Sequence, residues 1–314
     1  MEPAPETRPF RFGLLLDSRE ASGAGVAHVA QRAEEIGFST LLGTDHVGRW
    51  SSTLLLLAAA EATTRLRIGT FVLNNDLRNP VMLAQELATL DMLSDGRLEV
   101  GIGAGWMAAD YAGTGITLDP PSRRLRRLEL SLNLIKRALT DGRVDVPASG
   151  DQPAMFVRAM PRSVQRPHPP FLVGGGGPRM LRFAAGAADI ISLNPRSTPD
   201  GAMDPGDATS DAVDAKIELI REAAGPRWSS LELNANLFGL NPDPENAHGP
   251  AAPLLAALSH QELTESPHFL FGDVAEMASQ LEERRRRWGL SYVVVRQADL
   301  DTAAPLVRYM QPNR

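Results

Sequence analysis

The stretch Leu98-Glu-Val-Gly-Ile-Gly-Ala-Gly-Trp106 is a short apolar strand pattern that runs directly into closely spaced glycines. The same pattern recurs at Pro170-Phe-Leu-Val173, which four glycines follow, Gly174 to Gly177. Because glycine adopts positive φ angles and lacks a Cβ atom, a ligand can reach the backbone at such turns. Two strand-to-glycine transitions, each leading toward a helical pattern, predict an α/β scaffold that holds a large phosphorylated cofactor at its strand ends.

Strand and helix patterns alternate outward from these two stretches over most of the chain. Strand patterns occupy residues 10–16, 39–43, 66–73, 97–102, 171–173, 189–193, 231–240 and 291–295. Helical patterns lie between them at 25–36, 54–62, 80–92, 123–139, 178–187 and 212–224, and others flank the last strand. Such alternation of eight strands with helices predicts a (β/α)8 TIM barrel, with a doubly wound parallel sheet as the alternative. We favour the barrel because of the strand count, the uniform composition and the chemically interesting residues after several different strands.

The chain is expected to form a single domain over residues 1–314. Its N-terminal residues 1–8 are polar and proline-rich and are expected to be flexible. Segments rich in Pro, Gly, Asp, Ser and Thr predict inserted loops at about 110–121, 195–210 and 241–268, which would shape a substrate pocket.

Composition argues against several classes of function. The net charge of −6 gives no support to a nucleic-acid partner. The chain has no cysteine, and its six histidines show neither HxxxH nor HExxH spacing, so no metal site is expected. The N-terminus lacks the pattern of a signal peptide, and the longest apolar run, residues 54–60, is too short to cross a bilayer. We therefore expect a cytoplasmic protein without a membrane partner.

A group of polar and aromatic residues follows the second predicted strand. Asp45, His46 and Trp50 lie within seven residues after Gly43. Active-site residues of barrels lie at the ends of strands, and histidine exchanges protons near neutral pH. Asp45 and His46 are therefore candidate catalytic residues. The structural alternative is that Asp45 caps the next helix and His46 satisfies backbone groups.

Two asparagines, Asn74 and Asn75, close the third predicted strand. An asparagine side chain both donates and accepts hydrogen bonds, as the amide edge of a heterocycle requires. Asparagines are also common turn residues, and the spacing alone favours that interpretation.

The glycines after the fourth predicted strand match a dinucleotide fingerprint, Gly103-x-Gly105-x-x-Ala108. That fingerprint belongs in the first βαβ unit, with an acidic residue about 20 positions later. Here it follows the fourth strand, and Asp119 lies in a Pro-rich loop. A turn that brings the backbone near a flat ring fits this position better than NAD binding does.

The second glycine run, Gly174 to Gly177, is followed by Pro178 and Arg179. Proline at the first helical position leaves a helix N-terminus whose free N–H groups favour an anion, and an arginine adds a charge-assisted contact. No GK[ST] sequence follows, which argues against a nucleotide-triphosphate loop. The run predicts a phosphate site, and a flexible hinge is the alternative.

Together these residues resemble the luciferase-like flavin oxidoreductases, which are barrels of this kind. The resemblance extends from Phe10 to about Val295. Its most specific signal is Leu90-Asp-x-Leu-Ser-Asp-Gly-Arg97, which leads into the glycine turn. Asp45-His46 with Trp50 four residues on is similar to the branch that uses the deazaflavin coenzyme F420 instead of FMN.

The resemblance implies roles for several residues. His46 would act on the substrate oxygen, and Asp45 would lie against the cofactor. Phe71 and Val72 would form a bulge behind the central ring, often with a cis peptide bond, and Asn74 would contact the pyrimidine edge. The remaining cofactor contacts would be Gly103, Ala104 and Gly105 and, at the phosphate, Gly175, Gly176 and Gly177.

One position departs from the family pattern. The deazaflavin-dependent sugar-phosphate dehydrogenases carry a glutamate where this chain has Trp106. A tryptophan cannot perform the proton transfer of a carboxylate, which argues against sugar-phosphate oxidation. Trp106 and Trp50 are instead expected to line an apolar substrate pocket.

The resemblance implies an oxidoreductase that transfers a hydride between coenzyme F420 and an organic substrate. The alternatives are an FMN-dependent luciferase-like monooxygenase that uses dioxygen and a flavin-binding relative without catalytic activity. The expected partner is a small organic molecule, and the family pattern implies a homodimer.

Overall fold

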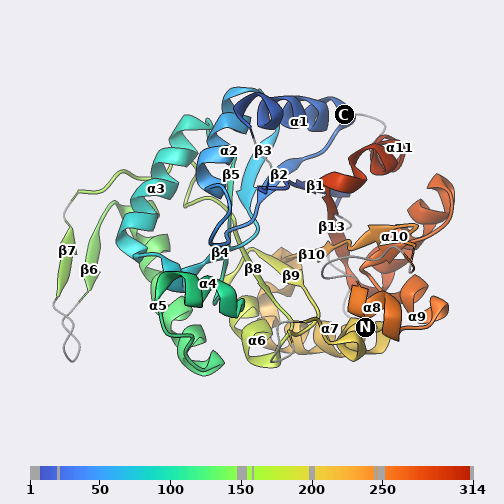
Figure 1. Cartoon of the computed structure of the whole chain (residues 1–314). Helices are drawn as coiled ribbons and strands as arrows, with labels where there is room; N and C mark the ends of the chain where they lie inside the picture. The colour runs from blue at the N-terminus through green and yellow to red at the C-terminus, as the bar shows by residue number, and fades with distance from the viewer. Residues whose placement is uncertain are drawn as a thin grey trace.

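Parallel strands form a closed barrel in the computed structural model, which describes residues 8–19, 22–146, 154–157, 159–197, 202–243, 245 and 252–311. The barrel strands are β1 (Arg11–Leu15), β2 (Thr40–Gly43), β3 (Arg67–Thr70), β5 (Leu98–Gly103), β8 (Phe171–Gly175), β9 (Ile190–Leu193), β10 (Glu232–Asn236) and β13 (Leu290–Arg296). Their order is β3-β2-β1-β13-β10-β9-β8-β5, and a β3–β5 pairing closes the ring (Figure 1). This closure confirms the TIM barrel, because a doubly wound sheet would leave two open edges.

Helices surround the barrel (Figure 1). Each packs an apolar stripe against the strands, as in α5, where Leu128, Leu132, Ile135 and Leu139 are buried at helical spacing. The main helices are α1 (Gly23–Ile36), α2 (Ser52–Glu61), α3 (Pro80–Leu93), α5 (Pro121–Asp141), α6 (Pro178–Ala187), α7 (Ser210–Ala224), α10 (Val274–Trp288) and α11 (Leu300–Met310). In the described part of the chain, no helix combines the length and apolar character needed to cross a membrane.

Local capping explains where two of these helices begin. The Asn79 side chain accepts hydrogen bonds from the first turn of α3, and Pro80 occupies the first helical position, as predicted. Asp273 caps α10 and forms a reciprocal capping box with Glu276.

The third predicted strand, residues 66–73, is interrupted. β3 ends at Thr70, β4 (Leu73–Asn74) resumes the pairing with β5, and the Phe71–Val72 peptide bond between them is cis. The Thr70 hydroxyl donates to the Gly101 carbonyl at 2.7 Å and accepts from the Gly101 N–H at 2.9 Å. A side chain thus replaces a backbone partner in the ladder, and the chain bulges at Phe71 and Val72.

The seventh predicted strand, residues 231–240, is also divided. β10 ends at Asn236, and β11 (Gly239–Leu240) pairs with β12 (Phe269–Leu270) in a separate two-stranded sheet. A second small sheet, the antiparallel hairpin of β6 (Val144–Val146) and β7 (Met155–Val157), has no counterpart among the predicted elements.

The predicted insertions contain regular structure. The prediction of a loop throughout 110–121 is wrong, because α4 (Ala108–Thr114) covers its first part and ends at Gly115 with a φ of 71°. Alanines favour this helix, and the glycine supplies its left-handed end. The other segments contain the 3₁₀ helix η2 (Pro205–Ala208), α8 (Ala252–Ala257) and α9 (His260–Glu265). Residues 198–201, 244, 246–251 and the first seven of the predicted flexible N-terminus lie outside the described residues. Short 3₁₀ helices also occur as η1 (Asn75–Leu77), η3 (Gly225–Ser230) and η6 (Gln297–Asp299).

Charged side chains fill the end of the barrel at which the strands begin. Arg11 donates to Glu99 at 2.6 Å and to Glu232 at 2.7 Å, and Arg67 donates to Glu99 at 2.7 Å. Burial alone would raise the pKa of Glu99, but the two guanidinium groups outweigh it and lower that pKa. The cluster links β1, β3, β5 and β10. The interior beyond it contains an apolar cluster, Leu42, Leu172, Ile190, Tyr292 and Val294, with Phe71 and Val72 packed against it. A buried polar pair adjoins this cluster, because the Ser192 hydroxyl donates to Asn234 Oδ1 at 2.7 Å.

We expect Glu99→Gln to lower the free energy of unfolding by about 3–5 kcal/mol, because it replaces a buried carboxylate that pairs with two half-buried guanidinium groups, those of Arg11 and Arg67. Urea denaturation at pH 7 measures this loss. Glu283→Gln is the control, since Glu283 and Arg286 form an exposed pair and its loss should have little effect.

The same comparison has a defined pH dependence. Because the pKa of Glu99 is lower in the folded than in the unfolded chain, its contribution is complete above about pH 4.5 and fades as the pH falls further. The stability gap between wild type and Glu99→Gln should therefore narrow in acid. A gap that stays constant as the pH falls below 4 would contradict the assignment.

Candidate active site

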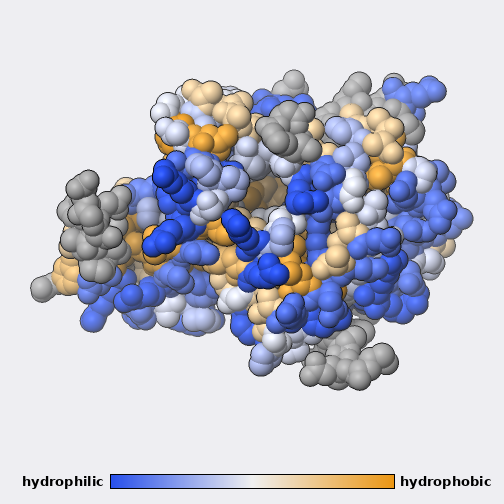
Figure 2. All heavy atoms as spheres, turned by 90° about the horizontal axis from the view of Figure 1, so that it is seen from below, coloured by the Kyte–Doolittle hydropathy of each residue, from blue (hydrophilic) through white to orange (hydrophobic). Residues whose placement is uncertain are grey.

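The predicted site residues all follow strands, and parallel strands in a closed barrel end on one rim. Asp45 and His46 follow β2, Phe71 to Asn74 follow β3, Gly103 to Gly105 end β5, and Gly174 to Gly177 end β8. β4, α4 and α6 lie on the lower side of the barrel in Figure 1. Figure 2 views that side and shows a hollow near its middle, with apolar atoms at its floor and hydrophilic atoms around much of its rim.

Val72 lies between the two glycine turns. A Cβ atom added at Gly103 would lie 2.9 Å from a Val72 methyl carbon, and one added at Gly174 would lie 3.8 Å from the other methyl carbon. The turn at Gly103 therefore approaches the bulge more closely than any other residue type would allow. Three segments that are far apart in the sequence meet here.

Asn74 carries a buried amide group with one engaged atom and one free atom. Its Oδ1 accepts a hydrogen bond from the Asp76 N–H at 3.1 Å. Its Nδ2 is buried and meets no partner within hydrogen-bond geometry in the part of the chain that the structure describes, although Asn74 is near enough to the Tyr111 hydroxyl to lower its pKa. Gly105, at a φ of +76°, lies so close that an added Cβ would be 2.4 Å from Oδ1. A buried donor without a partner is costly, so Nδ2 is available to a ligand.

Asp45 is held by an arginine that sequence reasoning missed. Its carboxylate accepts from Arg78 Nη2 at 2.7 Å, from Arg78 Nε at 3.0 Å and from the Asn74 N–H at 3.1 Å. Burial alone would lower the pKa of Arg78, but the hydrogen bond and charge of Asp45 outweigh it and raise that pKa. Asp45 therefore fixes the end of β2 against β4, and the cap of α2 is at Ser51 instead.

His46 contacts an acid that lies within a segment predicted to be a loop. Its Nδ1 lies 2.9 Å from Asp110 Oδ2, and Asp110 Oδ1 accepts from the Val47 N–H at 3.0 Å. The Trp106 ring meets the imidazole edge-on, with centroids 6.2 Å apart and planes at 88°. Trp50 and Trp106 remain 60% and 43% exposed, as side chains that contact a substrate would be. Without α4 in the prediction, nothing indicated that Asp110 faces His46.

Hydrogen-bonded polar side chains hold the first glycine turn, residues 103–105. The Tyr111 hydroxyl lies 3.1 Å from Asp76 Oδ2 and 3.3 Å from the Ala104 carbonyl, and Arg127 donates to the same Asp76 carboxylate. Burial, followed by the charge of Asp76, raises the pKa of Tyr111 and keeps its hydroxyl protonated. Sequence reasoning missed all three residues, because their spacing carries no local pattern.

In the second glycine run, the backbone at Gly176 is tightly packed, whereas the space beside Gly177 is open. A Cβ at Gly176 would lie 2.3 Å from the Asn194 carbonyl oxygen, whereas at Gly177 no described heavy atom lies within 4 Å. Gly177 is the N-cap of α6 and provides no side-chain cap, so N–H groups of the first turn face outward. Arg179 is exposed in that turn. The arrangement suits an anion, and the phosphate site stays a prediction.

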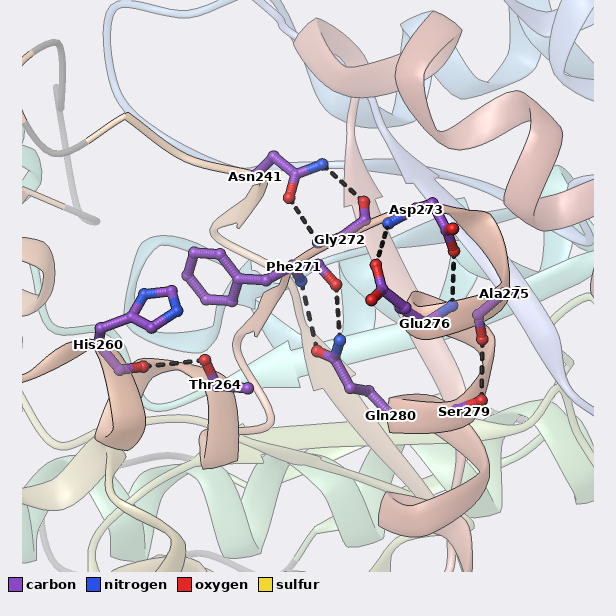
Figure 3. Close-up of a pocket in the computed structure, with 10 residues that line it drawn as sticks. All are labelled: Asn241, His260, Thr264, Phe271, Gly272, Asp273, Ala275, Glu276, Ser279 and Gln280. Atoms are coloured by element: carbon purple, nitrogen blue, oxygen red, sulfur yellow. Dashed lines mark hydrogen bonds between the residues drawn. The ribbon is translucent and has the colours of Figure 1, made fainter.

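The pocket in Figure 3 lies elsewhere, where β12 meets α10. Its volume is about 730 Å³. The Asn241 side chain bonds both the N–H and the carbonyl of Gly272, and Gln280 does the same for Phe271. Its polar lining is thus engaged in holding a turn, and none of the predicted site residues lines it.

Comparisons with known proteins agree with this geometry. A family model described as luciferase-like monooxygenase matches residues 9–224. A protein of Amycolatopsis mediterranei named F420-dependent glucose-6-phosphate dehydrogenase is 31% identical over 57% of this chain and 56% of its own length. The chain thus spans about half the length of this curated relative. An uncharacterised protein of Mycobacterium tuberculosis is 31% identical over 74% of this chain and 92% of its own length.

A solved structure shows the same fold over nearly the whole chain. Coenzyme F420-dependent tetrahydromethanopterin reductase from Methanopyrus kandleri superimposes with a TM-score of 0.74 and 20% identity. The match covers 96% of this chain and 97% of that one.

We expect Gly176→Ala to lower the free energy of unfolding by about 1–3 kcal/mol, because its methyl group would collide with backbone. Gly177→Ala is the matched control, since its φ is −79° and the space beside it is open. Thermal and urea denaturation of both variants measure the difference. Equal losses in the two variants would show that Asn194 does not constrain the turn.

Proposed function

Since this chain belongs to the luciferase-like monooxygenase family, we propose that it is an oxidoreductase that transfers a hydride between coenzyme F420 and a small organic substrate. The observation that carries the proposal is the unpartnered, buried Nδ2 of Asn74 at the glycine-lined rim. A donor in that position fits a carbonyl on the edge of a flat heterocycle.

The residues around Asn74 fit a deazaflavin. Gly103, Ala104 and Gly105 offer backbone without a large side chain, and Phe71 with Val72 provides an apolar surface beneath a ring. The phosphate tail would bind at the N-terminus of α6, with contacts from Gly174, Gly175, Gly176, Gly177 and Arg179. Asp45 would present the edge of its Arg78-bound carboxylate toward the cofactor.

The bound deazaflavin supplies or accepts the hydride, and the chain supplies binding, orientation and a proton. His46 is the proposed proton-exchanging group, because its ring is 26% exposed at the rim while Asp110 holds its Nδ1. Trp106 covers one edge of the imidazole and would limit water there. General acid–base catalysis of this kind contributes about 10²–10⁴-fold to a rate.

The relatives' names favour F420 over the alternatives. Several relatives about 30% identical over more than half of this chain are named F420-dependent glucose-6-phosphate dehydrogenases. An FMN-dependent monooxygenase is the second candidate, because the family description names a monooxygenase. A flavin-binding protein without catalysis is the third, and it would not need His46.

The substrate proposed here has an apolar body and an oxygen that His46 can reach. Trp106 replaces the glutamate of the sugar-phosphate enzymes, and Trp50 adds a second exposed aromatic surface. A homodimer is part of the proposal. It is supported by three exposed apolar side chains, Leu54 on α2 and Met82 and Met92 on the neighbouring α3. A second copy of this chain would shield them from water.

Fluorescence titration of the protein with F420 and with FMN tests the cofactor. We expect tighter binding of F420, and we expect Asn74→Asp to weaken it about tenfold or more, because an isosteric acceptor replaces the donor. Asn133→Asp, at an exposed position of α5, is the control. Binding of FMN alone at micromolar concentration would overturn the F420 assignment.

His46→Gln tests the proton role. Turnover should fall about 10²–10⁴-fold with cofactor affinity unchanged, because the amide cannot exchange a proton. His28→Gln, at an exposed position of α1, should match the wild type. If the His46 variant turned over substrate at the wild-type rate, the residue would have no catalytic role.

A further inference from the structure

We propose that Asp110 is a positioning residue that acts through His46. It holds the imidazole proton on Nδ1, so that Nε2 is the atom that exchanges a proton with the substrate. This inference rests on the proposed function for its chemical consequence, but its structural content concerns only residues of this chain.

The hydrogen-bond pattern allows Asp110 only to accept a hydrogen bond from the imidazole. An ionised carboxylate only accepts hydrogen bonds. One oxygen accepts from the Val47 N–H at 3.0 Å, and the other lies 2.9 Å from His46 Nδ1. The side chain of Asp110 is 4% exposed, so water cannot replace these partners. Nδ1 must therefore carry the proton in both the neutral and the charged imidazole.

The packing of α4 fixes this geometry. The Asp110 N–H donates to the Met107 carbonyl at 3.0 Å, which places the acid in the first turn of the helix. A Cβ at Gly113 would lie 3.1 Å from Val47 Cγ1, so the helix rests directly on the loop that carries His46. Trp106 closes a further side of the ring. Turning the imidazole over would break its hydrogen bond to Asp110.

The consequence is a defined path for one proton. When the substrate is oxidised, its hydride would pass to the F420 of the proposed function, and Nε2 accepts the proton of its hydroxyl group. The resulting imidazolium stays paired with the Asp110 carboxylate. When the substrate is reduced, Nε2 returns that proton to the substrate oxygen. In either direction Asp110 itself neither gains nor loses a proton.

Two simpler roles for Asp110 make different predictions. An acid in the first turn of a helix is favourable on its own, and the bond to Val47 N–H anchors a loop. Either role would affect the stability of the fold, but neither would determine which nitrogen of the His46 imidazole carries the proton. Asp301 is the control: it also lies in the first turn of a helix, α11, but is 77% exposed and pairs with Arg32 instead of a histidine.

The experiment is ¹⁵N NMR of histidine-labelled protein without cofactor, with the His46 signals assigned by their loss in His46→Gln. In the wild type at a pH where His46 is neutral, we expect a protonated Nδ1 and an unprotonated Nε2. In Asp110→Asn the amide oxygen can keep the Val47 bond while its NH₂ group faces Nδ1, so the proton should move to Nε2. Asp301→Asn should leave the spectrum unchanged.

A wild-type spectrum with the proton on Nε2, or an identical pattern in Asp110→Asn, would overturn the proposal. The wild-type spectrum decides the first point even if the variant does not fold. In turnover assays Asp110→Asn should lower kcat about 10- to 100-fold with little change in KM. If Asp110→Asn kept a normal kcat while His46→Gln was inactive, the positioning role of Asp110 would be refuted and the proton role of His46 would stand. Absence of F420 binding to the wild type would refute the proposed function and leave the NMR result valid.

Discussion

The barrel depends on the burial of one carboxylate, Glu99, between the guanidinium groups of Arg11 and Arg67. A charge in such a place is tolerable only with partners in good geometry, so the cluster admits one register of the strands that it joins. Glu99 lies on β5 and Arg67 on β3, the two strands whose pairing closes the ring. The charged cluster thus fixes β3 and β5 at the end where they begin. The glycine turn after β5 and Asn74 after β3 lie at their opposite ends.

At the opposite end, acidic side chains perform a similar task on a smaller scale. Asp45 binds Arg78, Asp76 binds Tyr111 and Arg127, and Asp110 binds His46. Each acid joins a strand end or loop to a neighbour, and each is shielded from water. The first glycine turn, with Gly103 and Gly105, lies among these anchors. The rim therefore combines rigid attachment with open space, which is what the binding of a flat ring requires.

Much of the architecture could be predicted because the strands and helices follow from local sequence patterns. Apolar runs and helical stripes gave all barrel strands in order, and the glycine runs marked where a ligand could approach the backbone. The predictions were wrong where a distant group changed the local outcome. The strand at 66–73 breaks because the Thr70 side chain occupies the bonding groups of Gly101 on a neighbouring strand. The segment at 110–121 was assigned from its turn residues, although α4 fills its first part.

The sequence by itself determined the alternation of strands and helices, the glycine turns and the position of His46 at a strand end, because each depends on residues within one or two turns of chain. Only the tertiary structure decided which side chains face one another. His46 and Asp110 are 64 positions apart, and Arg11 and Glu232 are 221 apart. No periodicity records such pairings, because they arise from the closure of the barrel, which brings strand ends together regardless of their separation along the chain.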